Sequence, residues 1–203
     1  MDQIYDFVLG MTGSRPIEIA AVILGLINVT LIIRRNVWNY PFGIVMVILY
    51  AQIFYDYRLY SDALLQLYFL VIQIYGWWYW LRGRDDRGLV IVARLPIAQI
   101  PYYAVIAIVG LAILGTSMDQ LTDADYPYWD GAIAVLSVLA QFLLSRRRLE
   151  SWFLWIAVDL LAIGLFWVKG LYPTSALYAV FLVLATVGLF NWVRAWRRGV
   201  ALA

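Results

Sequence analysis

Polar and aromatic side chains recur at helical spacing through one otherwise apolar stretch of the chain. At about 100° per residue they fall within about 60° of one another on a helix, and they are Asp62, Gln66, Gln73, Trp77 and Trp80. Amides donate and accept hydrogen bonds, and indole rings stack on flat rings and attract cations. The stripe has the chemistry to bind a flat, hydroxyl-bearing aromatic molecule, although Gln66 and Gln73 fit equally well as hydrogen-bonding links between helices.

A second stripe of this kind follows later in the chain and contains a carboxylate. Its members are Trp152, Trp155, Asp159 and Phe166. Asp159 lies near the centre of an apolar stretch, and no other acidic residue lies so deep in one. A carboxylate inside a membrane is a functional hypothesis by default, and here it would attract a cationic ligand. The alternative is a structural acid that is protonated or paired within the helix bundle.

The composition predicts that helices in a membrane carry both stripes. Of the 203 residues, 65% are hydrophobic and only 14% are charged, whereas a soluble domain has about a quarter of its residues charged. This excludes a soluble globular protein and predicts an all-α integral membrane protein. Seven runs approach the length of about 20 apolar residues that spans a bilayer, at about residues 16–33, 41–57, 61–81, 95–115, 129–145, 152–168 and 174–194.

The distribution of basic residues predicts the orientation of these spans. Positively charged side chains near short loops stay on the cytoplasmic side. With the N-terminus outside and the C-terminus in the cytoplasm, 12 of the 15 lysines and arginines lie on the cytoplasmic side. The predicted external loop at 116–130 contains four aspartates and no basic residue.

The residue types that are missing narrow the chemistry. The chain has no cysteine and no histidine, which removes disulfides, thiol chemistry and the usual transition-metal ligands. We therefore expect no metal and no cofactor, and the net charge of +2 gives no reason to expect a nucleic-acid partner. An enzyme fits poorly, because the spans contain no close carboxylate pair and no phosphate-binding glycine loop. A transporter and a non-transporting membrane assembly protein remain.

An internal repeat favours the transporter. A single shift of the chain along itself, without gaps, places Arg34-Arg35 on Arg146-Arg147, Gly76 on Gly188 and Trp80 on Trp192. This repeat shift predicts one transmembrane domain over residues 1–203, built as a 3+1+3 parallel repeat: three spans at about 16–81, a linker helix at about 95–115 and three spans at about 129–194. In transporters built from repeats the substrate site lies between the repeats, near the bilayer midplane.

The two predicted repeats differ in their polar residues. Tyr178 and Trp192 stand at the positions that match Gln66 and Trp80, whereas alanine and leucine replace Gln73 and Trp77. The amides therefore lie in the first half and the charge lies in the second. This asymmetry is expected where an asymmetric ligand binds in a pseudo-symmetric site.

Several longer motifs resemble those of the Pnu-type vitamin transporters, over about residues 17–196. They are "NYPFGI", "RLYSDALLQ" and "QIYGWWYW" in the first half, and "YPYWDG", "RRRLESWFLWIAVD" and "KGLYPTSALY" in the second. The resemblance implies a fold similar to that of the sugar-transporting SWEET proteins, a homotrimer in the bacterial cytoplasmic (inner) membrane, and facilitated diffusion with trapping of the substrate by phosphorylation. It also implies that Gln73, Trp77, Trp80, Trp155 and Asp159 face the substrate, and the stripes add Gln66 and Tyr178.

The resemblance implies a vitamin as the substrate and leaves three candidates. Nicotinamide riboside and thiamine both combine a flat cationic ring with a hydroxyl-bearing arm, and the two amides favour a ribose diol, so nicotinamide riboside is predicted first. Some nicotinamide riboside transporters of this family carry asparagine where this chain has Asp159, and thiamine is therefore the alternative. Riboflavin is neutral and bulkier, and would leave Asp159 without an ionic partner.

Overall fold

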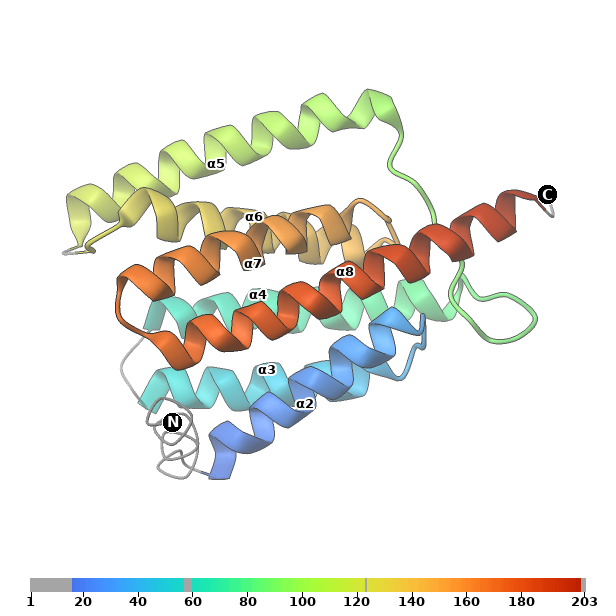
Figure 1. Ribbon diagram of the computed structural model, residues 1–203, viewed down its shortest axis with the longest axis horizontal. Coiled ribbons are helices and arrows are strands. Elements are labelled where there is room, and N and C mark those ends of the chain that lie inside the picture. The colour runs from blue at the N-terminus through green and yellow to red at the C-terminus, as the bar shows by residue number, and fades with distance from the viewer. Residues whose placement is uncertain (1–15, 57–59, 123, 202–203) are drawn as a thin grey trace. The chain divides into compact units, whose positions relative to one another are not determined.

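The computed structural model describes residues 16–56, 60–122 and 124–201, without the side chains of residues 60–62 and 200–201. Seven α-helices occupy these ranges (Figure 1): α2 (Pro16–Ile33), α3 (Asn39–Asp56), α4 (Tyr60–Leu81), α5 (Ile100–Leu121), α6 (Pro127–Ser145), α7 (Ser151–Val168) and α8 (Tyr172–Ala201). A short 3-10 helix, Ile97–Gln99, precedes α5. The chain divides into two compact units, the first ending at Val90 and the second beginning at Ile91.

The predicted all-α class is confirmed, and a helix lies at each of the seven predicted places. Five helical segments of the described chain are long and apolar enough to cross a membrane: Pro16–Ile33, Ile97–Leu121, Pro127–Ser145, Ser151–Val168 and Tyr172–Gly199. The other two helices, α3 and α4, contain 18 and 22 residues. These two helices are long enough to cross a membrane, but they are less apolar than the other five because they contain many amide and aromatic side chains.

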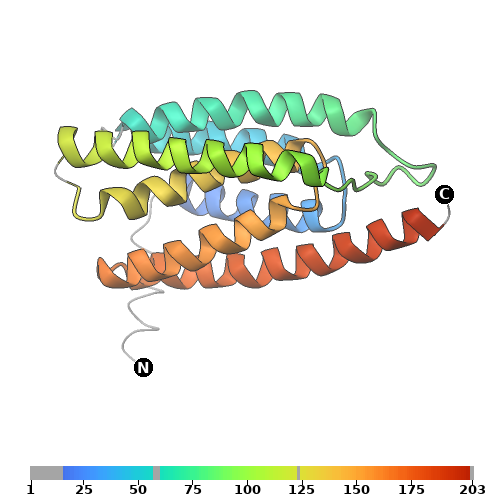
Figure 2. The ribbon, with the colours of Figure 1, turned by 90° about the horizontal axis from the view of Figure 1, so that it is seen from above.

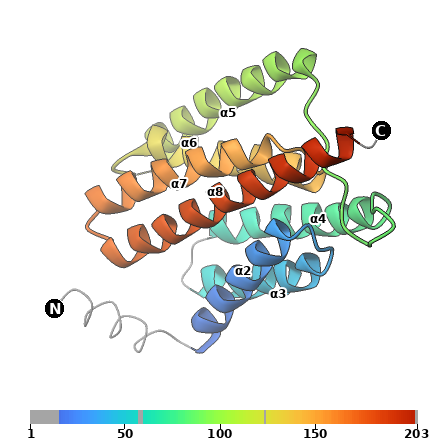
Figure 3. The ribbon, with the colours of Figure 1, turned by 45° about the vertical axis from the view of Figure 1, so that its right-hand side comes forward.

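In the first unit, α3 packs against both α2 and α4 (Figure 3). The Tyr40 ring at the start of α3 meets the Trp80 ring edge to face, with 5.2 Å between the ring centroids. Gly76 makes this approach possible, because a Cβ at that position would overlap the Tyr40 ring. Helix α2 ends in a Schellman turn, in which Arg35 has a positive φ of 57° and the Asn36 amide donates to the Leu31 carbonyl at 2.9 Å.

In the second unit, α6 packs against α5 and α7, and α7 runs beside α8, which continues beyond it (Figure 2). Trp152 at the start of α7 meets Trp192 edge to face at 5.6 Å, and a Cβ at Gly188 would overlap the Trp152 ring. Helix α6 also ends in a Schellman turn, with a φ of 61° at Arg147 and the Arg148 amide donating to the Leu143 carbonyl at 2.9 Å.

These local features recur at positions that the repeat shift relates. Helices α3 and α7 each contain 18 residues, and the ring pair, the glycine beneath the ring and the left-handed arginine occupy matching positions in both units. Each unit therefore builds the same junction, which consists of a Schellman turn after its first repeat helix and a ring pair between its second and third repeat helices. The arrangement of the two halves as a parallel repeat within one domain stays a prediction.

The clearest differences from the predicted boundaries are at both ends of α5, which runs over Ile100–Leu121, and at the end of α8, which continues to Ala201 and not to about 194. The linker helix was expected at about 95–115, and α5 begins at Ile100. The segment before it is extended because it pairs with the α6–α7 turn: the Ala93 amide donates to the Arg147 carbonyl at 3.0 Å, and the Leu149 amide donates to the Ala93 carbonyl at 2.9 Å. Backbone groups used in this way are not available to a helix.

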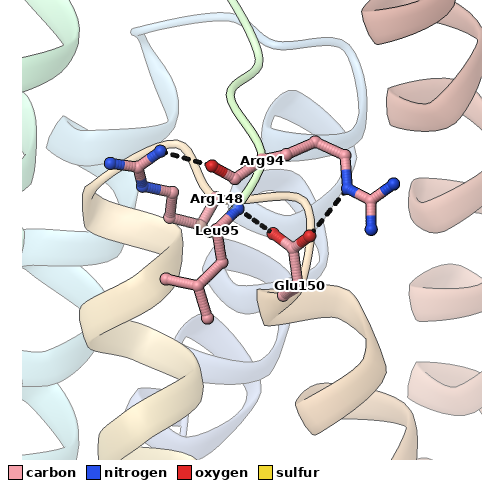
Figure 4. Close-up of polar contacts among 4 residues, drawn as sticks. All are labelled: Arg94, Leu95, Arg148 and Glu150. Atoms are coloured by element: carbon pink, nitrogen blue, oxygen red, sulfur yellow. Dashed lines mark hydrogen bonds and ion pairs between the residues drawn. The ribbon is translucent and has the colours of Figure 1, made fainter. Parts of the chain in front are cut away.

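Side chains reinforce this pairing (Figure 4). The Glu150 carboxylate accepts hydrogen bonds from the Arg94 Nε at 2.8 Å and from the Leu95 amide at 2.7 Å, and Arg148 donates to the Arg94 carbonyl. The Arg94 guanidinium also lies over the Trp196 ring of α8, 5.2 Å from its centroid. The start of the linker is thus fixed to the second unit at one end of α7.

Candidate functional site

The α4 stripe contains residues in different degrees of contact with solvent. Trp80 is fully enclosed against Tyr40, and Gln73 is buried, whereas Gln66 and Trp77 are half-buried. The Asp62 side chain lies outside the part of the chain that the structure describes. Of the four predicted site residues on α4, Trp77 and Gln66 are therefore accessible, and Trp80 is held in the junction with α3.

Gln73 is only 5% exposed and makes no hydrogen bond to a described residue, and its amide atoms are not among the completely covered side-chain atoms that lack a partner. It lies against Gly43 of α3, where an added Cβ would overlap its Nε2 atom. An amide in this condition keeps its donors and acceptor available to a polar group. A polar ligand at this position would satisfy it.

Asn28 of α2 also lies against Gly43, and the sequence analysis missed it. It is 4% exposed, its Nδ2 donates to the Asn39 carbonyl at 2.7 Å, and the same Nδ2 lies 2.6 Å from the place where a Cβ of Gly43 would be. A lone amide in the first apolar run was the only signal in the sequence. No spacing argument connects Asn28 with Gly43 and Gln73, because the three residues come from three different helices.

In the second unit, α7 carries Trp155 and Asp159 one turn apart. Asp159 is 4% exposed, and within the described ranges its carboxylate has neither a hydrogen bond nor an ion pair. Trp155 is half-buried. Tyr178 of α8 stacks on Phe166 of α7, with 5.3 Å between the centroids and 20° between the ring planes. The second unit thus places a carboxylate and two accessible aromatic residues on its α7 and α8 helices.

Trp152, which the sequence placed in the same stripe, has a different environment. It is enclosed against Trp192 and Gly188, and its Nε1 has no hydrogen-bond partner among the described residues. Its position corresponds to that of Tyr40 in the first unit. The Trp152 ring therefore belongs to the second unit's own copy of the junction. Within the α7 stripe Trp152 is thus enclosed and Asp159 is buried, whereas Trp155 and Phe166 are half-buried.

These groups are suited to binding a ligand. In the part of the chain that the structure describes, no group of three or more histidines, cysteines, aspartates or glutamates could hold a metal ion. The first unit offers the Gln73 amide with the half-buried Trp77 ring on the same helix, and the second unit offers the Asp159 carboxylate with the half-buried Trp155 ring on the same helix. Amides bind hydroxyls, a carboxylate neutralises a positive charge, and indole rings stack on flat rings.

Comparison with known proteins identifies a family and several relatives that match most of the chain. The family model described as "Nicotinamide mononucleotide transporter" matches residues 15–194. The nicotinamide riboside transporter PnuC of Escherichia coli strain K12 is 27% identical over 206 residues, covering 89% of this chain and 86% of that protein. The riboflavin/roseoflavin transporter RibM of Streptomyces davaonensis is also 27% identical, over 185 residues that cover 84% of this chain and 81% of RibM.

A solved structure resembles nearly the whole chain. The crystal structure of the vitamin B3 transporter PnuC superposes with a TM-score of 0.77 at 25% sequence identity, covering 97% of this chain and 88% of that one.

Proposed function

Since this chain belongs to the nicotinamide mononucleotide transporter family, and is a multi-pass membrane transporter and not an enzyme, we propose that its substrate is nicotinamide riboside. The observation that carries the proposal is the pair of buried polar groups without partners among the described residues, Gln73 and Asp159. A cationic pyridinium ring linked to a ribose supplies a positive charge for the carboxylate and hydroxyls for the amide. PnuC relatives described as nicotinamide riboside transporters support the same choice.

The proposed roles follow the site residues predicted from the sequence, and each unit is considered by itself. In the first unit Gln66 and Gln73 bind hydroxyls and Trp77 offers a ring face, while Trp80 takes part through its packing on Tyr40. In the second unit Asp159 meets the positive charge, and Trp155 and Tyr178 offer further ring faces. That residues of both units contribute to one site stays a prediction from the sequence.

Two other vitamins remain as alternatives. Riboflavin is favoured by one specific observation, the similarity to the riboflavin/roseoflavin transporter RibM over 84% of this chain, and against it stands its neutral ring, which would leave Asp159 unpaired. Thiamine has a cationic ring, which would suit Asp159, and a hydroxyl-bearing arm.

A binding panel tests the substrate. Purified protein is titrated calorimetrically with nicotinamide riboside, thiamine, riboflavin and nicotinamide mononucleotide, and we expect the riboside to bind at least tenfold more tightly than the other three. The mononucleotide should bind weakly because its phosphate adds a charge of about −1.5 to −2 near pH 7, close to the Asp159 carboxylate. Tighter binding of riboflavin or thiamine would reassign the substrate within the family, and binding of none of the four would refute the proposed recognition.

We further propose that transport is facilitated diffusion into the cytoplasm, with the N-terminus outside and the substrate trapped by phosphorylation. Sodium-coupled transporters commonly use broken helices, and each of the seven described helices is continuous. Four prolines lie in the first turns of α3, α5, α6 and α8, where the missing amide hydrogen breaks no helical bond; they are Pro41, Pro101, Pro127 and Pro173. A homotrimer in the bacterial cytoplasmic membrane completes the proposal, following the resemblance.

Proteoliposomes without a kinase are expected to equilibrate the riboside and not to concentrate it. The described spans contain one deeply buried carboxylate, Asp159, whereas proton-coupled transporters commonly use chains of titratable groups. Uptake is measured with proton and sodium gradients imposed in turn, and empty liposomes provide the control. Accumulation above the outside concentration that is lost when the gradient collapses would contradict facilitated diffusion.

A further inference from the structure

Three helices of the first unit meet at Gly43, and two amide side chains lie against it. Gln73 reaches this point from α4 and Asn28 reaches it from α2, and a Cβ on residue 43 would overlap the amide nitrogens of both. The two amides are therefore neighbours, although they lie far apart in the sequence. Only a glycine on α3 leaves room for this pair.

The two amides are held differently. Asn28 is fixed, because its Nδ2 donates to the Asn39 carbonyl at 2.7 Å, and Asn39 is itself fixed by a hydrogen bond from its Nδ2 to the Asn36 carbonyl at 2.7 Å. Gln73 has no hydrogen bond to any described residue, although it is nearly as deeply buried. Packing around Gly43, and no hydrogen bond to a described residue, thus sets the place of the Gln73 amide.

The second unit has none of these three residue types at the matching positions. The repeat shift leads from Asn28 to Ala140, from Gly43 to Trp155 and from Gln73 to Ala185. The junction, by contrast, is present in each unit with its aromatic pair, its glycine and its left-handed arginine. Asn28, Gly43 and Gln73 thus all differ from their counterparts in the second unit, whereas the junction is the same in both units. This is expected for a set of residues that serves recognition.

We propose that Asn28 and Gly43 are positioning residues that hold the Gln73 amide for hydrogen bonding to the hydroxyls of the substrate. This inference rests on the proposed function of Gln73 and adds the two residues that give it a defined geometry. Asn28 acts through Gln73, so the pair discriminates substrates by their hydroxyl-bearing part and not by their ring. A buried donor or acceptor left unpaired rejects analogues that lack the matching group.

The test compares two ligands that share a cationic ring. Nicotinamide riboside carries the ribose hydroxyls, and 1-methylnicotinamide lacks them. Asn28→Ala and Gly43→Ala are each expected to weaken binding of the riboside about fivefold, the range for one hydrogen bond, and to change the affinity for 1-methylnicotinamide by less than about twofold. Gly43→Ala displaces the two amides from another helix while both side chains remain, so it tests the inference even if Asn28→Ala does not fold.

A matched glycine controls for the effect of a helical Gly→Ala change. Gly25 of α2 has only the flexible Met46 Sδ within 4 Å of an added Cβ, at 3.1 Å, and Gly25→Ala should leave both affinities unchanged. Thermal unfolding in detergent checks that each variant is folded.

A double-mutant cycle then shows whether Asn28 acts through Gln73. The variant with both Asn28→Ala and Gln73→Ala should bind the riboside as Gln73→Ala alone does, because a positioning residue has no effect once its target is gone. Additive losses, equal losses for both ligands, or unchanged riboside affinity in folded Asn28→Ala or Gly43→Ala protein would overturn the inference. Wild-type protein that binds neither ligand would refute the proposed function itself, and that result is distinct from a loss confined to the variants.

Discussion

Replacement of Trp77 by alanine is expected to lower the affinity for nicotinamide riboside roughly thirtyfold while the protein remains folded. A desolvated cation on an indole face is stabilised by about 2 kcal/mol, and about 1.4 kcal/mol corresponds to a tenfold change in the dissociation constant. Trp77 is half-buried, so its removal takes away a ring face without opening the enclosed junction of Tyr40 and Trp80. Calorimetric titration of the purified variant measures the change.

The neighbouring tryptophan is the matched control. Trp78 is 52% exposed, and the Arg82 guanidinium lies over its ring, 3.9 Å from the centroid. It has the exposure and the basic neighbour of a membrane-interface residue, and Trp78→Ala should change the affinity by less than about twofold. Trp77→Phe should restore part of the lost affinity because a phenyl ring also presents a π face. Equal effects at both tryptophans, or none at Trp77, would assign Trp77 to helix packing.

Asp159→Asn is expected to weaken binding of nicotinamide riboside about tenfold and to leave measurable affinity. The asparagine keeps a hydrogen-bonding oxygen at the same position and removes the negative charge. Charge-assisted hydrogen bonds are roughly twice as strong as neutral ones, and a difference of about 1.4 kcal/mol corresponds to the tenfold loss. Asp159 has no partner among the described residues that could take the ligand's place.

A neutral form of the ligand separates charge from shape. The reduced, dihydro form of nicotinamide riboside has nearly the same outline and carries no charge on its ring. Its affinity should be similar in wild-type protein and in Asp159→Asn, so the tenfold effect should appear only with the cationic form. If Asp159→Asn binds the cationic riboside as well as wild type does, the carboxylate is structural or protonated, and an uncharged substrate such as riboflavin gains support.

The sequence alone determined the class and the helices. The length of an apolar run and the fraction of charged residues can be read directly from the sequence. Lipid offers no hydrogen-bond partners to the backbone, so an uninterrupted helix is the simplest structure that pairs every backbone group. For this reason the predicted run at 152–168 begins next to the first residue of the observed helix Ser151–Val168 and ends at its last. Helical spacing also placed Trp155 and Asp159 on one face, because both lie on the same short stretch of chain.

The tertiary structure decided which residues become neighbours and which rings remain accessible. The start of α5 at Ile100 depends on pairing of Ala93 with the distant turn between α6 and α7, and no local pattern contains that information. Trp77 and Trp80 are equivalent in the sequence pattern, yet Trp80 is enclosed because Tyr40 packs over Gly76. The meeting of Asn28 and Gln73 at Gly43 likewise requires three helices to pack side by side, and contacts between helices follow from side-chain volumes that periodicity does not encode.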